Sequence, residues 1–336
     1  PLPPSRRPVL DVADVAGVEL LSPPQQSEPT DLQHKFAARQ FVVSVEIDPP
    51  KSADASAILR AARMLKENGV DVLNIADTPM ARMRMSAWAL CYLAQSQVGM
   101  ETVLHFPTRG RNLLRVQGDL LAAHALGIRN ILVVMGDPTS HGDYPQATDQ
   151  SDIVPSGLVR LIKQQFNTGM DHASTSIGQA TTFHVGVALN MAAADREKEI
   201  KTFRKKVEAG ADYALTQPLY ESGVCERFVT HYRERYGPLP IPILMGLMPL
   251  ASARNAEFIH NEVPGLQLPL SVLERMRGSG KRGRKEGIRI CQELLLEAHE
   301  LVQGVYVMPT LERYESVMEI MEALPSDRQQ RGTDAT

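Results

Sequence analysis

Glu46 is the first residue of this sequence whose type and neighbouring residues suggest a chemical role. It lies in the segment VSVEIDPP, where a β-branched run delivers a carboxyl group and Pro49 and Pro50 then fix the exit of the chain. A carboxyl group in partly apolar surroundings has a raised pKa and can donate a proton near neutral pH. The alternative is a solvated glutamate at the end of a strand.

Asp137 is the second candidate. It follows the apolar run ILVVM in a Gly136-Asp137-Pro138 turn. The run is apolar throughout, which is typical of a strand buried on both faces, and glycine lets the backbone approach a ligand closely. The carboxylate would then project beyond the strand end. The alternative is a turn that binds no ligand.

A repeating pattern from Phe41 onward predicts the elements that position these groups. Short β-branched runs alternate with longer segments of helical spacing. Most runs start about 30 residues apart, the length of one strand–helix unit, and eight such units close into a (β/α)₈ TIM barrel, an α/β fold. The predicted strands are 41–46, 71–76, 101–105, 130–135, 182–189, 212–217, 241–247 and 304–308. The clearest predicted helices are 54–68, 81–96, 112–126, 193–209 and 285–301.

Two intervals interrupt this rhythm, 136–152 after the fourth strand and 248–284 after the seventh. Long insertions in a barrel are usually binding loops, so we expect extended loops at both places. An open doubly wound sheet is the alternative fold. Its dinucleotide-binding variant needs a Gly-x-Gly-x-x-Gly turn after an early strand, and the sequence has none there.

The predicted strand ends share one chemical character. Barrel enzymes carry their chemistry where strands end, because the loops there converge on one mouth. These ends carry carboxylates, an imidazole and amides, without a nucleophilic serine or cysteine and without a metal-ligand cluster, so we expect no metal site. The residues are Glu46, Asp77, His105, Asp137, Asn190, Gln217 and the segment 308–313.

Charge and composition exclude several classes of protein. The 336 residues carry 36 basic and 39 acidic side chains, a net charge of −3, which argues against a nucleic-acid binder. No run of 18 apolar residues is present, so we expect no membrane span. Cys91, Cys225 and Cys291 lie too far apart in sequence for a zinc clip or a small disulfide framework. A reduced, cytoplasmic protein is the expectation.

The ends of the chain differ from its centre. The stretch up to about Thr30 is rich in proline and has little periodicity. We therefore expect a proline-rich linker or N-terminal arm over 1–37, a barrel over 38–325 and a disordered tail over 326–336.

Five ordered motifs give the chain a specific resemblance. They are Glu46 with its two prolines, Gly136-Asp137, KKVEAGAD at 205–212, Thr216-Gln217 and GLMP at 246–249. In this order they resemble the methylenetetrahydrofolate reductase family over about 38–324. The segments VEIDPP, GDP with GDYP, and RNAEFIHNEVPG are similar above all to the reductase half of bifunctional homocysteine S-methyltransferase/methylenetetrahydrofolate reductase proteins.

The resemblance implies an FAD-binding barrel that reduces 5,10-methylenetetrahydrofolate to 5-methyltetrahydrofolate, with NADH or NADPH as electron donor. It implies that Glu46 is the general acid that protonates N10 of the folate and opens its five-membered ring. It also implies that Asp137 stabilises the resulting N5 iminium cation. Hydride then comes from reduced FAD.

The resemblance also assigns binding residues. The substrate-binding positions it implies are Gln217, Asn255, Ile259 and Arg313. The cofactor-binding positions it implies are Asp77, His105, Met135, Gly136, Asp137, Ser156, Asn190, Glu199, Thr202, Lys205 and Lys206.

The sequence departs from the family pattern at four of its positions. Met135 stands where many members have arginine, Asn190 replaces a histidine and Gly186 replaces a tyrosine near the flavin. Ile259 replaces an aromatic residue that stacks on a ligand in some members. These changes leave the identity of the electron donor open.

Two other functions therefore stay open. One is a folate-binding flavoprotein that takes electrons from a redox partner protein instead of NAD(P)H. The other is a catalytically idle folate-binding module of a fused methyltransferase. The resemblance further implies a homo-oligomer and a fused or associated homocysteine methyltransferase.

Overall fold

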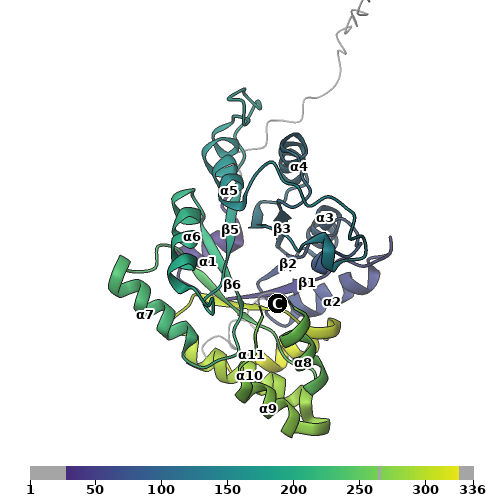
Figure 1. Cartoon of the computed structure of the whole chain (residues 1–336). Helices are drawn as coiled ribbons and strands as arrows, with labels where there is room; N and C mark the ends of the chain where they lie inside the picture. The colour runs from purple at the N-terminus through teal and green to yellow at the C-terminus, as the bar shows by residue number, and fades with distance from the viewer. Residues whose placement is uncertain (1–27, 264–265, 325–336) are drawn as a thin grey trace, which may run out of the picture.

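Eight parallel strands close into a barrel in the computed structural model, which describes residues 28–263 and 266–324 (Figure 1). Each strand pairs with the next along the chain, and the last pairs with the first. This architecture confirms the predicted TIM barrel. The strands are β1 (Val42–Ile47), β2 (Val72–Ile75), β3 (Thr102–Pro107), β4 (Asn130–Val134), β5 (His184–Leu189), β6 (Tyr213–Pro218), β7 (Ile243–Leu247) and β8 (Gly304–Val307).

All eight strands were predicted within two residues of their observed ends. The reason is burial, because nearly every strand residue is inaccessible on both faces of the sheet. Such strands consist of apolar, β-branched runs that stand out against the amphipathic segments between them.

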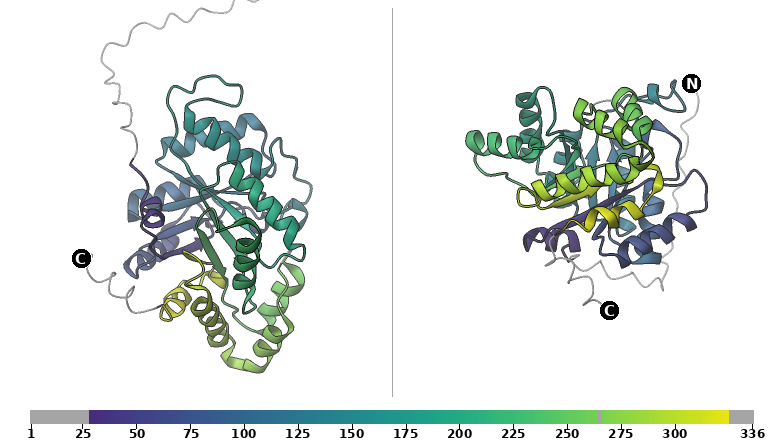
Figure 2. Two further views of the ribbon diagram at one scale, coloured as in Figure 1. Left: turned by 90° about the vertical axis from the view of Figure 1, so that its left-hand side faces the viewer. Right: turned by 90° about the horizontal axis from the view of Figure 1, so that it is seen from below.

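Helices surround the strands on the outside of the barrel, as Figure 2 shows from two further directions. Five of them match the predicted helical segments: α2 (Ser56–Glu67), α3 (Ala87–Val98), α4 (Leu113–Ala125), α6 (Arg196–Glu208) and α10 (Gly283–Ala298). The others are α1 (Asp31–Ala37), α5 (Pro155–Gln164), α7 (Val224–Tyr236), α8 (Ala253–Glu262), α9 (Leu270–Ser279) and α11 (Glu315–Met321).

The two long intervals differ from each other in structure. The chain after β4 runs through an extended loop before α5 begins at Pro155, as expected. The interval after β7 is extended too, but α8 and α9 fill much of it. These helices pack on each other, and α9 packs on α10.

Helix α1 lies in the range that we expected to be a linker or arm. Thr30 caps it, with Gln33 completing a capping box, and Leu32 and Phe36 are buried. The Phe36 ring lies 5.5 Å from the Tyr213 ring and 5.9 Å from the His184 ring. The helix therefore belongs to the barrel. Residues 1–27 and the expected tail 326–336 lie outside the described residues.

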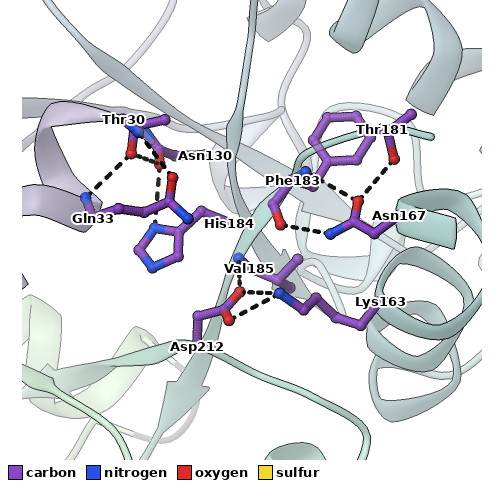
Figure 3. A network of polar contacts seen from close by, with 10 residues as sticks. All are labelled: Thr30, Gln33, Asn130, Lys163, Asn167, Thr181, Phe183, His184, Val185 and Asp212. Atoms are coloured by element: carbon purple, nitrogen blue, oxygen red, sulfur yellow. Dashed lines mark hydrogen bonds and ion pairs between the residues drawn. The ribbon is translucent and has the colours of Figure 1, made fainter. Parts of the chain in front are cut away.

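A polar network at the amino-terminal end of the barrel ties α1 to the strands (Figure 3). The Thr30 hydroxyl donates to Asn130 Oδ1 at 3.0 Å, and His184 Nδ1 lies 3.3 Å from the same oxygen. Burial lowers the pKa of His184 to about 4, so this ring is neutral. The buried polar groups of this network satisfy one another.

Two aspartates fix neighbouring strands at this same end. Asp212 accepts a hydrogen bond from the backbone of Val185 at 2.7 Å and pairs with Lys163 at 2.8 Å (Figure 3). Asp71 accepts one from the backbone of Val43 at 2.6 Å and pairs with Lys35. In both the β1–β2 pair and the β5–β6 pair, an aspartate carboxylate thus binds a backbone N–H of the neighbouring strand and a lysine.

Tyr213 explains one departure from the family pattern. A Cβ atom on Gly186 would lie 2.5 Å from the Tyr213 ring, so any larger residue at 186 would collide with it. The aromatic ring in this part of the barrel therefore comes from β6 and fills the space that Gly186 on β5 leaves open.

We predict that Phe36→Ala lowers the free energy of unfolding by about 2–4 kcal/mol, because it removes a buried aromatic ring from the closed end of the barrel. Denaturant unfolding measures this change. His34→Ala is the matched control on the exposed face of α1. Equal unfolding midpoints for the two variants would show that α1 is not part of the cooperative fold.

Candidate active site

Glu46 lies near the carboxyl end of β1, at the mouth of the barrel. Its side chain is 24% exposed. Loss of hydration, followed by the nearby carboxylates of Asp48 and Asp137, raises its pKa from 4.5 to about 8. Glu46 is therefore protonated at neutral pH and has the protonation state that a general acid requires.

A buried histidine lies beside this acid. His105 of β3 places Nδ1 4.0 Å from Glu46 Oε2 and Nε2 3.3 Å from Oδ1 of Asn74 on β2. Asn74 in turn donates to the hydroxyl of Ser44 on β1. Burial lowers the pKa of His105 to about 3, so the ring is neutral. Sequence reasoning missed Ser44 and Asn74, although each is a polar residue inside an apolar strand.

Asp137 follows β4 on an exposed turn. Its Oδ2 accepts a hydrogen bond from the backbone N–H of Met80 at 2.6 Å. Arg109 donates to the carbonyl oxygen of Asp137 and, at 2.8 Å, to the hydroxyl of Thr78. The loops after β2, β3 and β4 therefore hold this carboxylate at the mouth together.

A side chain at position 136 would be strained and crowded in this turn. It has φ +89°, and a Cβ there would lie 3.0 Å from Pro107 Cβ and 3.2 Å from Arg109 Cβ. Met135 beside it is 66% exposed. The guanidinium of Arg109, which sequence reasoning also missed, reaches the same turn from the loop after β3. A cation is thus present next to Met135, where many family members carry an arginine.

Asp77, a predicted cofactor-binding residue, follows β2 and is engaged in an ion pair. Its side chain is only 8% exposed and pairs with Arg111 at 2.7 Å. Arg111 also pairs with Asp119, and its guanidinium stacks on Trp88 at 4.8 Å. Burial raises the pKa of Asp77, and Arg111 opposes that rise. The Asp77 carboxylate therefore links the loop after β2 to the loop after β3.

The predicted cofactor residues after β5 gather where this strand meets α6. Glu199 accepts from the backbone N–H of Asn190 at 2.9 Å, and Asn190 Oδ1 accepts from the backbone of Ala192 at 3.1 Å. Lys206 donates to the carbonyl of Ala188 at 2.6 Å, and burial lowers its pKa. These bonds fix the backbone at the end of β5.

The remaining predicted cofactor residues are less constrained. The Thr202 hydroxyl donates to Lys198 O at 2.9 Å within α6, and Lys205 is exposed on the same helix. Ser156 is half-buried in the first turn of α5.

Gln217 is the exposed residue of β6. The pairing of β6 with β7 shifts in register between Leu215 and Pro218, and such an irregularity can re-aim a side chain at a barrel rim. Arg313 is exposed in the segment that follows β8. Both side chains are available at the end of the barrel where Glu46 lies.

Asn255 is half-buried and Ile259 is buried, and both lie on α8. Asn255 Oδ1 accepts from the backbone of Ala251 at 2.9 Å, so this amide helps to shape the start of α8. Ile259 is 4% exposed and packs in the hydrophobic core, whereas the adjacent Phe258 is 46% exposed. One helical position turns a side chain by about 100°, so Phe258 presents its ring on the exposed face of α8 while Ile259 faces the core.

The cysteines, possible metal ligands and helix lengths of the described part of the chain bear on the remaining sequence expectations. The three cysteines are buried, and burial raises the pKa of the Cys91 and Cys225 thiols to about 12. No three His, Cys, Asp or Glu side chains among residues 28–263 and 266–324 are grouped to hold a metal ion. None of the described helices is long and apolar enough to cross a membrane.

Comparison with known proteins fits this geometry. Residues 31–325 match the family model described as methylenetetrahydrofolate reductase. The chain belongs to the methylenetetrahydrofolate reductase family. Methylenetetrahydrofolate reductase 2 of Saccharomyces cerevisiae is 22% identical over 307 residues, which cover 88% of this chain and 49% of that protein. Methylenetetrahydrofolate reductase 1 of Schizosaccharomyces pombe is 25% identical over 60% of this chain and 32% of its own length.

This methylenetetrahydrofolate reductase family chain thus spans half or less of the length of these two curated relatives. A solved structure shares the fold, with a TM-score of 0.55 at 14% identity, and covers 90% of this chain and 100% of its own. It is a protein from Clostridium thermocellum described as binding two copies of 5-methyl-5,6,7,8-tetrahydrofolic acid.

We predict that Glu46→Gln stabilises the protein at pH 8 by roughly 2–5 kcal/mol, with no difference below pH 4.5. The folded state holds the Glu46 proton up to about pH 8, whereas the unfolded chain loses it near pH 4.5. The free energy of unfolding of the unmodified protein therefore falls as the pH rises between these values. Glutamine carries no such proton.

Denaturant unfolding from pH 4.5 to pH 8.5 measures this difference. Glu300→Gln is the control, because the Glu300 side chain is 86% exposed. A Glu46→Gln curve that parallels the unmodified protein at every pH would mean that the Glu46 carboxyl titrates normally.

Proposed function

We propose that this chain reduces 5,10-methylenetetrahydrofolate to 5-methyltetrahydrofolate, with FAD as the redox cofactor and NADH or NADPH as electron donor. The observation that carries the proposal is the raised pKa of Glu46 at the barrel mouth, close enough to Asp137 for the two carboxyl groups to interact. Family membership and the names of the curated relatives support it.

Glu46 acts as the general acid in this proposal. A pKa of about 8 keeps its proton on the carboxyl at neutral pH while leaving the group acidic enough to give it up. Transfer of that proton to N10 breaks the bond between N10 and the methylene carbon. The substrate is left as an N5 iminium cation, and Glu46 becomes a carboxylate.

Asp137 stabilises the cation formed in this step. An anion held by the Met80 N–H and by the Arg109 contact to its carbonyl needs little reorganisation when positive charge develops. This arrangement places fixed negative charge at the mouth before the substrate reacts.

The residues at the ends of β4 and β5 fit FAD by their chemistry. Met135 offers exposed apolar surface to a flat ring, and Gly136 lets the backbone approach it closely. Lys205 and Lys206 supply cations for a diphosphate, and Asn190 supplies an amide for hydroxyl groups. When bound, FAD supplies the hydride that reduces the methylene carbon.

Three exposed side chains would orient the substrates. Gln217 offers an amide to the pterin, and Arg313 offers a guanidinium to the folate. Phe258 offers an exposed aromatic face one position before Ile259, which stands where some family members have an aromatic residue. The three come from the ends of β6 and β8 and from α8.

The protein purified after expression, or after reconstitution, should contain FAD. Chromatography of the heat-released cofactor separates FAD from FMN. Recovery of FMN, or of no flavin after reconstitution, would contradict the cofactor assignment.

We expect Glu46→Gln to slow reduction of 5,10-methylenetetrahydrofolate by a factor of about 10² to 10⁴, the range for a positioned general acid. Reduction of the bound flavin by NAD(P)H should continue, because no proton passes to folate in that half-reaction. Anaerobic stopped-flow absorbance follows the two half-reactions separately. A near-normal folate half-reaction would remove Glu46 from the mechanism.

Phe258→Ala should weaken binding of NAD(P)H or of folate by about 2- to 13-fold, because an aromatic contact contributes about 0.5–1.5 kcal/mol. Titration of the anaerobic protein measures the two dissociation constants. Leu296→Ala on α10 is the control, since Leu296 is 52% exposed. Unchanged affinity for both ligands would place Phe258 outside the site.

A further inference from the structure

Three polar side chains lie inside the barrel next to Glu46. Ser44 and Asn74 are 0% exposed, and His105 is 8% exposed. They belong to the adjacent strands β1, β2 and β3. Burying polar groups in an apolar interior costs free energy unless they bind one another, so the bonds among these three decide what they do.

The hydrogen bonds among these three side chains determine which atoms donate and which accept. Asn74 Nδ2 donates to Ser44 Oγ, which leaves Asn74 Oδ1 facing His105 Nε2 at 3.3 Å. An amide oxygen can only accept a hydrogen bond, so Nε2 of the histidine carries the proton. Because the ring is neutral, Nδ1 carries none.

The unprotonated nitrogen is the one that faces Glu46. His105 Nδ1 lies 4.0 Å from Glu46 Oε2. A lone pair there favours the protonated carboxyl over the carboxylate. Asp48, which follows β1, and Asp137, which follows β4, act in the same sense. Tyr314 after β8 also faces this group, and Arg84 lies 3.9 Å from Asp48.

We propose that Asn74 is a positioning residue for the acid: it fixes His105 in the Nε2–H tautomer and thereby turns an unprotonated nitrogen toward Glu46. The inference rests on the proposed function where it makes Glu46 the acid. The tautomer itself can be measured without substrate.

The opposite end of the barrel contains a matched pair. There His184 Nδ1 lies 3.3 Å from Asn130 Oδ1, and Asn130 Nδ2 donates to Glu101 and, at 3.3 Å, to the carbonyl of Thr102. His184 therefore takes the Nδ1–H tautomer by the same reasoning. Asn130 and Asn74 are both buried partners of a buried histidine, but only Asn74 is connected to Glu46.

Nitrogen-15 NMR of histidine-labelled protein between pH 6 and pH 9 tests the tautomer directly. We expect a neutral Nε2–H ring for His105 and a neutral Nδ1–H ring for His184 in the same spectrum. An Nδ1–H or doubly protonated His105 would overturn the proposal. This measurement uses the unmodified protein and does not depend on whether a variant folds.

Asn74→Leu and Asn130→Leu then separate positioning from stability. Both remove a buried amide, but only Asn74→Leu should move the pH at which the folate half-reaction loses its acid, downward by about one unit. At pH 8 its rate should fall severalfold more than at pH 6. Equal loss of stability in both variants, with no shift of this pH for Asn74→Leu, would reduce Asn74 to a structural role.

The positioning role of Asn74 can also be tested if the proposed function is wrong. If the unmodified protein reduces no folate, the pH dependence of unfolding reports the pKa of Glu46 in its place. If this pKa is lower in Asn74→Leu than in the unmodified protein, the positioning role of Asn74 holds and only the proposed reaction is rejected. If the pKa is unchanged, the positioning role is rejected.

Discussion

Glu46 loses much of its hydration where β1 ends, and ionising it there costs free energy that water would otherwise supply. Other groups at the mouth also favour the protonated form of Glu46. Asp48 and Asp137 add negative charge, and His105 stays neutral because it is buried. A proton at neutral pH therefore resides on Glu46, although glutamate in water would have released it.

Carboxyl groups have different partners at the two ends of the barrel. At the amino-terminal end, Asp212 and Asp71 each pair with a lysine and a backbone N–H, and α1 covers the strands. At the mouth, the carboxyl groups of Glu46, Asp48 and Asp137 are brought close to one another instead, and Glu46 keeps its proton. The first arrangement stabilises the scaffold, and that stability permits the second, as is usual for barrels with catalytic loops at one end.

Most of the fold follows from the sequence because the strands are buried on both faces and read as apolar runs. Short α1, with two buried side chains, gives too little periodicity to be recognised. Glu46 and Asp137 could be chosen because each ends such a run. Asn74 stands out as a polar residue inside an apolar strand, but its partners and those of Arg109 could not be predicted, because these side chains meet others across strands and loops. The burial of Ile259 could not be predicted from the sequence, because packing decides which face of a helix is turned to the core.

The protonation state of Glu46 at neutral pH can be measured directly. Infrared difference spectroscopy of the unmodified protein against Glu46→Gln, titrated from pH 4 to pH 10, isolates the C=O band of this one carboxyl group. We expect the band to persist through pH 7 and to disappear with a midpoint near pH 8. A midpoint near 4.5, the ordinary value for glutamate, would contradict this expectation.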